Sequence, residues 1–218
     1  MKLHSFIREI LTFSFIFLFF LLPPVFVSFS INNNNVIQWN LPVSNIIYGL
    51  FSLALYLEYK QKTEIKTKFL FFYKEFSSFI FTFGFLFTTS LIFKFIASFY
   101  SVTNSTQINF PQTFLSWLYC LTSFLFSAFF EEVIYRFYTP EILKYLLNKI
   151  KSEKFIYIIS EGFPLVLFSI SHYYLGFLSV FNAMIAHIIL RICFNKSESI
   201  FPGFLAHFIY NIISLILL

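Results

Sequence analysis

Two adjacent carboxylates and a guanidinium group stand in an otherwise apolar part of the chain. Glu131, Glu132 and Arg136 lie in the stretch SAFFEEVIYRFY, directly after an apolar run that begins near Leu115. An ionisable side chain at the centre of a membrane-spanning helix costs about 2.5–3.5 kcal/mol, so each one needs a partner or a task. In a helix of about 100° per residue, Glu132 and Arg136 lie on one face and can form an ion pair. Glu131 points away from that pair, so we expect its carboxylate to face a cavity.

Two more polar pairs occur at helical spacing farther along the chain. FSISHYY places Phe168 and His172 four residues apart, and FLAHFIYN places His207 and Asn211 at the same spacing. Taken singly, a histidine in a membrane helix is more often a hydrogen-bonding partner of a neighbouring helix, and two glutamates can simply mark a helix end. Together, a carboxylate, two imidazoles and a carboxamide could surround one water molecule. Such a group has the base, the orienting partner and the oxyanion donors that peptide hydrolysis needs.

The order of these pairs resembles the CPBP intramembrane protease family, which includes the CAAX prenyl endopeptidases of the Rce1 type and the bacterial Abi proteins. The family pattern is E-E-x-x-x-R, then F-x-x-x-H, then H-x-x-x-N on successive transmembrane helices, and it is intact within about residues 115–215. The resemblance implies that Glu131 activates water, with His172 helping to hold it. It also implies that His207 and Asn211 stabilise the oxyanion. The supporting residues that it implies are Glu132, Arg136 and Phe168.

The sixth apolar segment departs from the family pattern. The family usually has glycines in the stretch FLSVFNAMIAHIILRICF, where this chain has none. We interpret His187, which lies near one of those positions, as a packing residue.

A metal-free glutamate mechanism, without a cofactor, is favoured over a zinc site. Glu131, His172 and His207 could supply three zinc ligands and leave one position open, and members of the family are often described as metalloproteases. However, the chain has no H-E-x-x-H motif, and asparagine is an unusual zinc ligand.

The elements that must position these residues are membrane-spanning helices. The chain has 218 residues, of which 58% are hydrophobic and 11% charged, and a soluble domain could not cover so much apolar surface. We predict an all-α, polytopic transmembrane bundle, with an N-terminal region of three spans in residues 1–112 and a catalytic core of four spans in residues 113–218. The seven predicted spans are 9–30, 44–58, 75–98, 113–135, 155–172, 177–193 and 199–217. Pro23-Pro24 should kink or end the first of them.

The basic residues are confined to alternate connections. Segments 1–8, 59–74, 136–154 and 191–198 hold fourteen of the fifteen Lys and Arg residues. By the positive-inside rule this pattern predicts a cytoplasmic N-terminus and an outside C-terminus, in what we expect to be a bacterial plasma membrane. It also argues against nucleic acid as a binding partner, because the net charge of +5 comes from these connections. Residues 139–154, with Thr139 as N-cap, read as an amphipathic helix at the cytoplasmic interface.

The depth of the two histidines poses a difficulty. If the fifth span begins at Phe155, His172 lies about 25 Å along it, whereas His207 lies only about 12 Å into its own span. We therefore predict that the stretch SEGFP breaks the fifth segment, so that the true span begins near Phe163. Glu161 would then lie at the break and have no catalytic role.

The predicted function is that of an intramembrane endopeptidase acting on a peptide or membrane-protein substrate in the lipid bilayer. The alternatives are a non-catalytic immunity or scaffolding protein of the same fold and a transporter that uses the glutamates as a proton relay. The sequence encodes no recognition of a prenyl group, and it does not indicate an oligomeric state.

Overall fold

The computed structural model describes all residues except 1–2, 31–35, 38, 63–71, 101–106 and 217–218. Almost every described residue lies in a helix. The helices are α1 (Leu3–Ile16), η1 (Phe17–Leu21), α2 (Leu22–Ser30), α3 (Val43–Lys62), α4 (Phe72–Tyr100), α5 (Phe114–Glu131), η2 (Glu132–Tyr138), α6 (Thr139–Leu146), α7 (Glu153–Ile170), η3 (Tyr173–Leu175), α8 (Phe177–Ser197) and α9 (Phe201–Ile216). Two-residue strands β1 (Val36–Ile37) and β2 (Gln107–Ile108) pair in parallel at one end.

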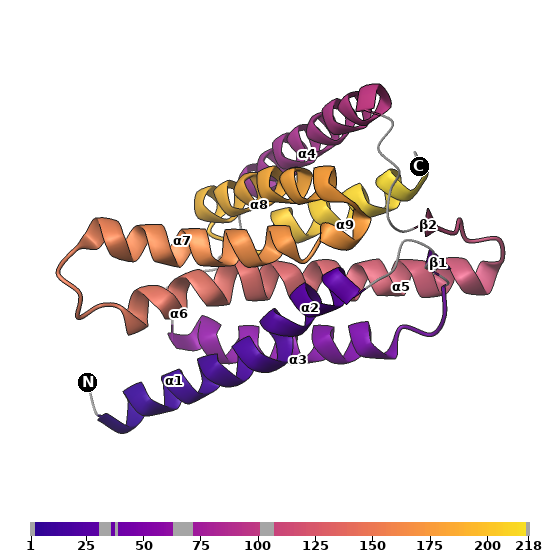
Figure 1. Cartoon of the computed structure of the whole chain (residues 1–218). Helices are drawn as coiled ribbons and strands as arrows, with labels where there is room; N and C mark the ends of the chain where they lie inside the picture. Colours follow the sequence, from indigo (N-terminus) through magenta and orange to yellow (C-terminus); the bar gives the residue numbers. More distant parts are fainter. Residues whose placement is uncertain (1–2, 31–35, 38, 63–71, 101–106, 217–218) are drawn as a thin grey trace.

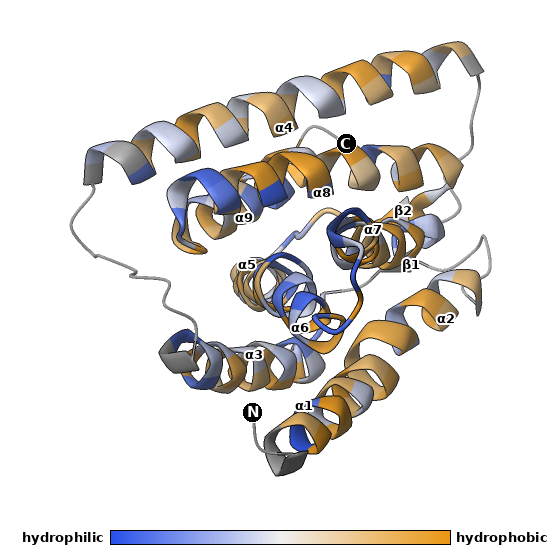
Figure 2. Ribbon diagram, turned by 90° about the vertical axis from the view of Figure 1, so that its left-hand side faces the viewer, coloured by the Kyte–Doolittle hydropathy of each residue, from blue (hydrophilic) through white to orange (hydrophobic). Residues whose placement is uncertain are grey.

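The long helix formed by α5, η2 and α6 lies at the centre of the bundle. Figure 2 shows it surrounded by α1, α2, α3, α7, α8 and α9, with α4 outermost against α8 and α9. The three predicted polar pairs lie on this central helix, at the end of α7 and on α9, with His172 in the turn that directly follows α7. The centre of the bundle is therefore the place where the chemistry of the chain converges.

The predicted helical membrane bundle is confirmed. Five helical segments are long and apolar enough to cross a membrane, and α9 is a shorter apolar helix. Each of the seven predicted spans corresponds to a helix of the structure, although α3, with 20 residues, is less apolar than those five segments. α1 begins and α9 ends at opposite ends of the bundle (Figure 1).

Two stretches of the bundle have the wider π-helical turn, and each ends two residues before a proline or proline pair. η1 precedes Pro23-Pro24, and η2 precedes Pro140. Proline has no N–H, and its ring clashes with the carbonyl four residues earlier, which in both cases belongs to the π-helical stretch. The wider turn lets the helix continue past the proline. The first helix therefore does not end at Pro23-Pro24.

The helix predicted from Thr139 is present as α6, but the predicted role of Thr139 as its N-cap is wrong. Thr139 is preceded by helical backbone at Tyr138, and its hydroxyl is buried without a hydrogen-bond partner among the described residues, so it does not cap a helix. α6 instead continues the central helix, and the apolar side chains of Ile142 and Leu143 are buried in the bundle. The apolar stripe of α6 therefore packs inside the bundle.

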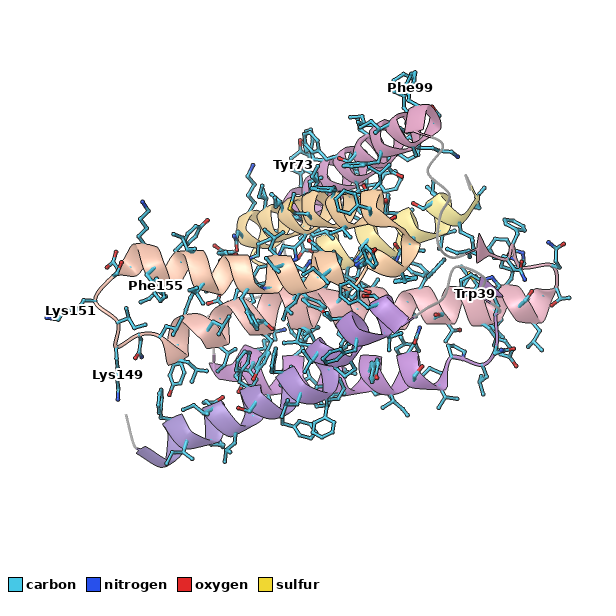
Figure 3. All side chains as sticks on the ribbon, in the orientation of Figure 1. Trp39, Tyr73, Phe99, Lys149, Lys151 and Phe155 are labelled. Carbon is cyan, nitrogen blue, oxygen red and sulfur yellow. The ribbon has the colours of Figure 1, made fainter. Side chains whose placement is uncertain are left out.

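The predicted break in the fifth segment is also wrong. α7 runs without interruption from Glu153 to Ile170, with Gly162 and Pro164 inside it. The difficulty over depth has a different solution, because the first turns of α7 extend past the end of α8, as the position of Phe155 shows (Figure 3). The depth of His172 therefore cannot be measured from Phe155.

The two ends of the bundle differ in chemistry. Lys149 and Lys151 lie at the end formed by α6 and α7, and Trp39 lies at the opposite end (Figure 3). The Trp39 indole donates to the carbonyl of Asn109 at 2.6 Å, which ties together the two connections that contain β1 and β2. On the Trp39 side, Gly176, with φ 105°, turns the chain from η3 into α8, a conformation that favours glycine.

Candidate active site

Glu132 and Arg136 form the buried ion pair that their spacing predicts. Their side chains are 2% and 0% exposed, and Arg136 Nη1 lies 3.6 Å from Glu132 Oε1. The same Nη1 donates to the main-chain carbonyl of Glu131 at 3.2 Å. Because a buried charge is costly without a partner, this pair holds the first turn of η2 in one arrangement.

Glu131 differs from its neighbour in both exposure and partners. Its side chain is 21% exposed. Its Oε2 atom is buried and has no hydrogen-bond partner among the described residues. Glu131 is therefore the carboxylate of the pair that is left available for a further ligand.

His207 brings α9 to both carboxylates. Its Nδ1 atom lies 3.0 Å from Glu132 Oε1, and its Nε2 atom lies 3.6 Å from Glu131 Oε2. An ionised carboxylate only accepts hydrogen bonds, so Nδ1–H of the ring donates to Glu132. The close approach of α9 depends on Gly203, where a Cβ atom would lie 3.1 Å from Glu132 Oε2.

The ring of Phe168 contacts several polar and aromatic side chains of the candidate site. The guanidinium carbon of Arg136 lies 3.9 Å from the centroid of its ring, a cation–π contact. The ring centroids of His172, Tyr135 and His187 lie 4.6, 5.3 and 5.5 Å away. The predicted stacking of Phe168 and His172 is present, and Phe168 also connects α7 to η2 and α8.

His172 is fixed by the end of its own helix. Its Nδ1 atom lies 2.8 Å from the carbonyl oxygen of Phe168, and since a carbonyl only accepts, Nδ1–H is the donor. In the neutral ring this leaves Nε2 as an acceptor. The carbonyl in the last turn of α7 therefore sets the orientation of the His172 ring.

Asn211 lies one helical turn beyond His207 on α9, on the same face. It is half-buried, and among the described residues its side-chain amide has no hydrogen-bond partner in the structure. Its amide group is therefore available to a ligand.

α8 packs closely without the glycines of the family pattern. Ala183 and Ala186 are buried along it. His187 is 2% exposed and contacts Phe168, while both of its ring nitrogens lack hydrogen-bond partners within the described part of the chain. Its surroundings are those of a packed side chain.

A metal finds no ready-made site among the described side chains. No group of three His, Cys, Asp or Glu side chains in that part of the structure is arranged to hold a metal ion. His207 Nδ1 is already engaged with Glu132, and His172 Nδ1 is engaged with a carbonyl. Nε2 of each ring is not engaged in these hydrogen bonds, and a metal-binding histidine commonly binds through one nitrogen while the other donates to a carboxylate or a carbonyl. The zinc alternative is therefore a matter for the chelator test below, and we derive no step through a metal.

The sequence interpretation missed an ionic cluster beside the site. Arg191 of α8 donates from Nε and Nη2 to the two carboxylate oxygens of Glu161, both at 2.7 Å. Glu141 and Lys144 complete the cluster, with Lys144 Nζ 3.0 Å from Glu141 and 3.2 Å from Glu161. The available signal was that Glu161 and Arg191 both lie in apolar segments, where charges need partners.

Comparisons with known proteins agree with the pattern of the three pairs. No curated protein and no solved structure matches the chain. Residues 112–213, which contain every predicted site residue, match the family model described as type II CAAX prenyl endopeptidase Rce1-like. The family resemblance predicted from the motifs is thus confirmed as a similarity of residues 112–213 to that family model.

Proposed function

We propose that the protein is an intramembrane endopeptidase in which Glu131 activates the water that attacks a peptide bond. The observation that carries this proposal is the contrast between the two adjacent glutamates. Glu132 is occupied by Arg136 and His207, whereas Glu131 has a buried oxygen without a partner. The match of residues 112–213 to a prenyl endopeptidase family supports the same reaction class.

In the proposed reaction, Glu131 accepts a proton from water as the water oxygen attacks the carbonyl carbon of the substrate. His172 presents Nε2 as an acceptor, because its Nδ1–H is bound to the Phe168 carbonyl. It can therefore hold the second hydrogen of the same water. The site would then supply a base and an orienting acceptor from two helices.

The tetrahedral intermediate carries a negative oxygen that needs donors. Asn211 lies on the same face of α9 as His207, and its amide NH2 group can donate to the oxyanion. His207 can add a donor at Nε2 only in its protonated form, because its Nδ1–H is bound to Glu132. We assign the oxyanion to this face. As the intermediate collapses, the carbon–nitrogen bond breaks, and the proton held by Glu131 passes to the leaving amine.

Glu132, Arg136 and Phe168 have supporting roles in this scheme. Arg136 contacts the Glu131 carbonyl and the Glu132 carboxylate, and its guanidinium group stacks on the Phe168 ring. The main-chain carbonyl of Phe168 accepts a hydrogen bond from His172. None of the three needs to touch the substrate. Their effect would be to keep Glu131, His172 and His207 at fixed separations.

The test compares wild type with Glu131→Gln, using a fluorogenic peptide library and protein purified in detergent. The matched control is Glu153→Gln, which makes the same change at an exposed carboxylate at the start of α7. We expect Glu131→Gln to lose cleavage by about 10²–10⁴-fold, the usual range for a general base, and Glu153→Gln to keep it.

Two results would overturn the proposed mechanism. Undiminished cleavage by Glu131→Gln would remove Glu131 from the role of base. Loss of wild-type cleavage on addition of a chelator, restored by zinc, would make the reaction metal-dependent. If wild type cleaves no peptide of the library, the non-catalytic immunity or scaffolding role replaces the enzymatic one.

A further inference from the structure

We propose that Arg191 is a positioning residue, which holds the π-helical segment η2 in register by donating a hydrogen bond to the main-chain carbonyl of Arg136. Through this bond it keeps Glu131 and Glu132 directed at His207. The inference rests on the proposed function for its catalytic consequence, but its structural part stands without it.

The main-chain carbonyl of Arg136 cannot make the hydrogen bond that is usual in an α-helix. In an α-helix, the carbonyl of Arg136 would accept from the N–H of the residue four positions later. That residue is Pro140, which has no N–H. In π-helical spacing the partner would be the N–H of Glu141, five positions later. The Arg136 carbonyl therefore lies where the central helix changes from π-helical to α-helical spacing, and a donor from another helix can stabilise it there.

Arg191 supplies that donor from another helix. Its Nη1 atom lies 2.5 Å from the Arg136 carbonyl oxygen, and the residue is buried on α8. Fifty-five residues separate the two partners in the sequence. The bond therefore fixes the position of η2 relative to α8 rather than a local turn.

Arg191 is itself held in one orientation. The fork of its guanidinium group binds both carboxylate oxygens of Glu161, and Nη2 also lies 3.3 Å from Glu141. With Lys144 the cluster contains two cations and two anions, so their charges balance in a partly buried place. A planar fork of five N–H groups can serve the carboxylate and the carbonyl at the same time, whereas the single ammonium of lysine cannot.

The main-chain segment that Arg191 contacts also positions side chains of the candidate site. The side chain of Arg136 contacts the Glu132 carboxylate, the Glu131 carbonyl and the Phe168 ring. A shift of the Arg136 backbone would therefore move all three. Arg191 would act on the reaction only through Arg136, without contact to substrate.

The test compares Arg191→Lys with Lys144→Met in the purified full chain. Arg191→Lys keeps a cation beside Glu161 but loses the simultaneous bond to the carbonyl. Lys144→Met removes a cation from the same cluster without touching that carbonyl. We expect Arg191→Lys to lower kcat for peptide cleavage at least tenfold with KM unchanged within twofold, and Lys144→Met to keep both values.

Hydrogen–deuterium exchange gives a readout that does not need activity. We expect the amides of residues 132–141 to exchange faster in Arg191→Lys than in wild type, and at the wild-type rate in Lys144→Met. Glu161→Gln is the second variant. It loosens the fork while retaining Arg191, so it should shift kcat and exchange in the same direction but by less.

Two outcomes would overturn the inference. One is that Arg191→Lys has the kcat and the amide exchange of wild type. The other is that Lys144→Met loses as much kcat as Arg191→Lys, because the charge of the cluster would then explain the loss of activity. If wild type itself does not cleave, the proposed function fails, and the exchange of residues 132–141 still decides whether Arg191 holds η2.

Discussion

At the residue scale, the contact between Gly203 and Glu132 brings the backbone of α9 close to a carboxylate of the candidate site. A Cβ atom on Gly203 would lie 3.1 Å from Glu132 Oε2, and the other oxygen of that carboxylate binds His207 at 3.0 Å. We expect Gly203→Ala to displace the carboxylate and to lower kcat about tenfold. Steady-state cleavage kinetics in detergent would measure this.

Gly84 provides the matched control for that substitution. It also lies inside a helix, α4, but a Cβ atom there would meet nothing within 4 Å. Alanine in place of a helical glycine stabilises a helix by up to about 1 kcal/mol. Gly84→Ala should therefore keep wild-type kcat, and an equal loss in both variants would contradict the role of the Gly203 contact.

Arg136 carries the buried positive charge of the candidate site. It is fully buried between Glu132, the Glu131 carbonyl and the Phe168 ring. Lysine keeps the charge but loses the planar stacking on the Phe168 ring. We expect Arg136→Lys to abolish most cleavage and to lower the Tm by several degrees, measured by thermal unfolding in detergent. An unchanged Tm together with full activity would show that the charge alone suffices.

At the element scale, Pro140 decides the register of the central helix. Replacing it with alanine restores an N–H and removes the ring clash, so the helix no longer needs the wider turn of η2. We expect Pro140→Ala to have a Tm at or above that of wild type and a kcat lowered about tenfold, because Glu131 and Glu132 rotate away from His207. Wild-type kcat with slower amide exchange in residues 132–141 would contradict this.

Most elements could be predicted from the sequence, but their local register could not. Apolar runs and flanking charges located all seven helical segments, because length and hydropathy decide whether a helix can cross a bilayer. The π-helical turns were missed, since a spacing argument assumes 100° per residue throughout. The expected break at Gly162 and Pro164 was wrong because a neighbouring helix end, not the helix itself, defines the depth of His172.

The residues of the candidate site stay a prediction from motif order, and their contacts could not be predicted in full. Motif order selected Glu131, His172 and His207, and the structure places the His207 ring beside both glutamate carboxylates. The sharing of His207 between two carboxylates depends on how α9 approaches η2, which no spacing within one helix encodes. The partnership of Arg191 with Glu161 depends in the same way on tertiary packing.

At the scale of the whole molecule, the distribution of charge predicts the orientation in the membrane. Lys151 is exposed at the end formed by α6 and α7, and Gln112 is exposed just before α5 begins at the other end. Cys120 and Cys193 are buried, so they should not react with a membrane-impermeant thiol reagent. We expect Lys151→Cys to be labelled only from the cytoplasmic side and Gln112→Cys only from outside, in intact cells and inverted vesicles. The reverse pattern would invert the predicted topology.

The wider turn of η2 also has a consequence for how such a chain can change in length. A π-helical turn holds one residue more than an α-helical turn, so residues 132–138 amount to an insertion of a single residue into an otherwise regular helix. A deletion of one residue there would leave α5 and α6 pointing in their present directions and would still be read as an apolar span. The two carboxylates, however, would no longer reach the same imidazole. In an alignment, a one-residue gap between Glu132 and Pro140 would therefore mark a chain that keeps the bundle and loses the site.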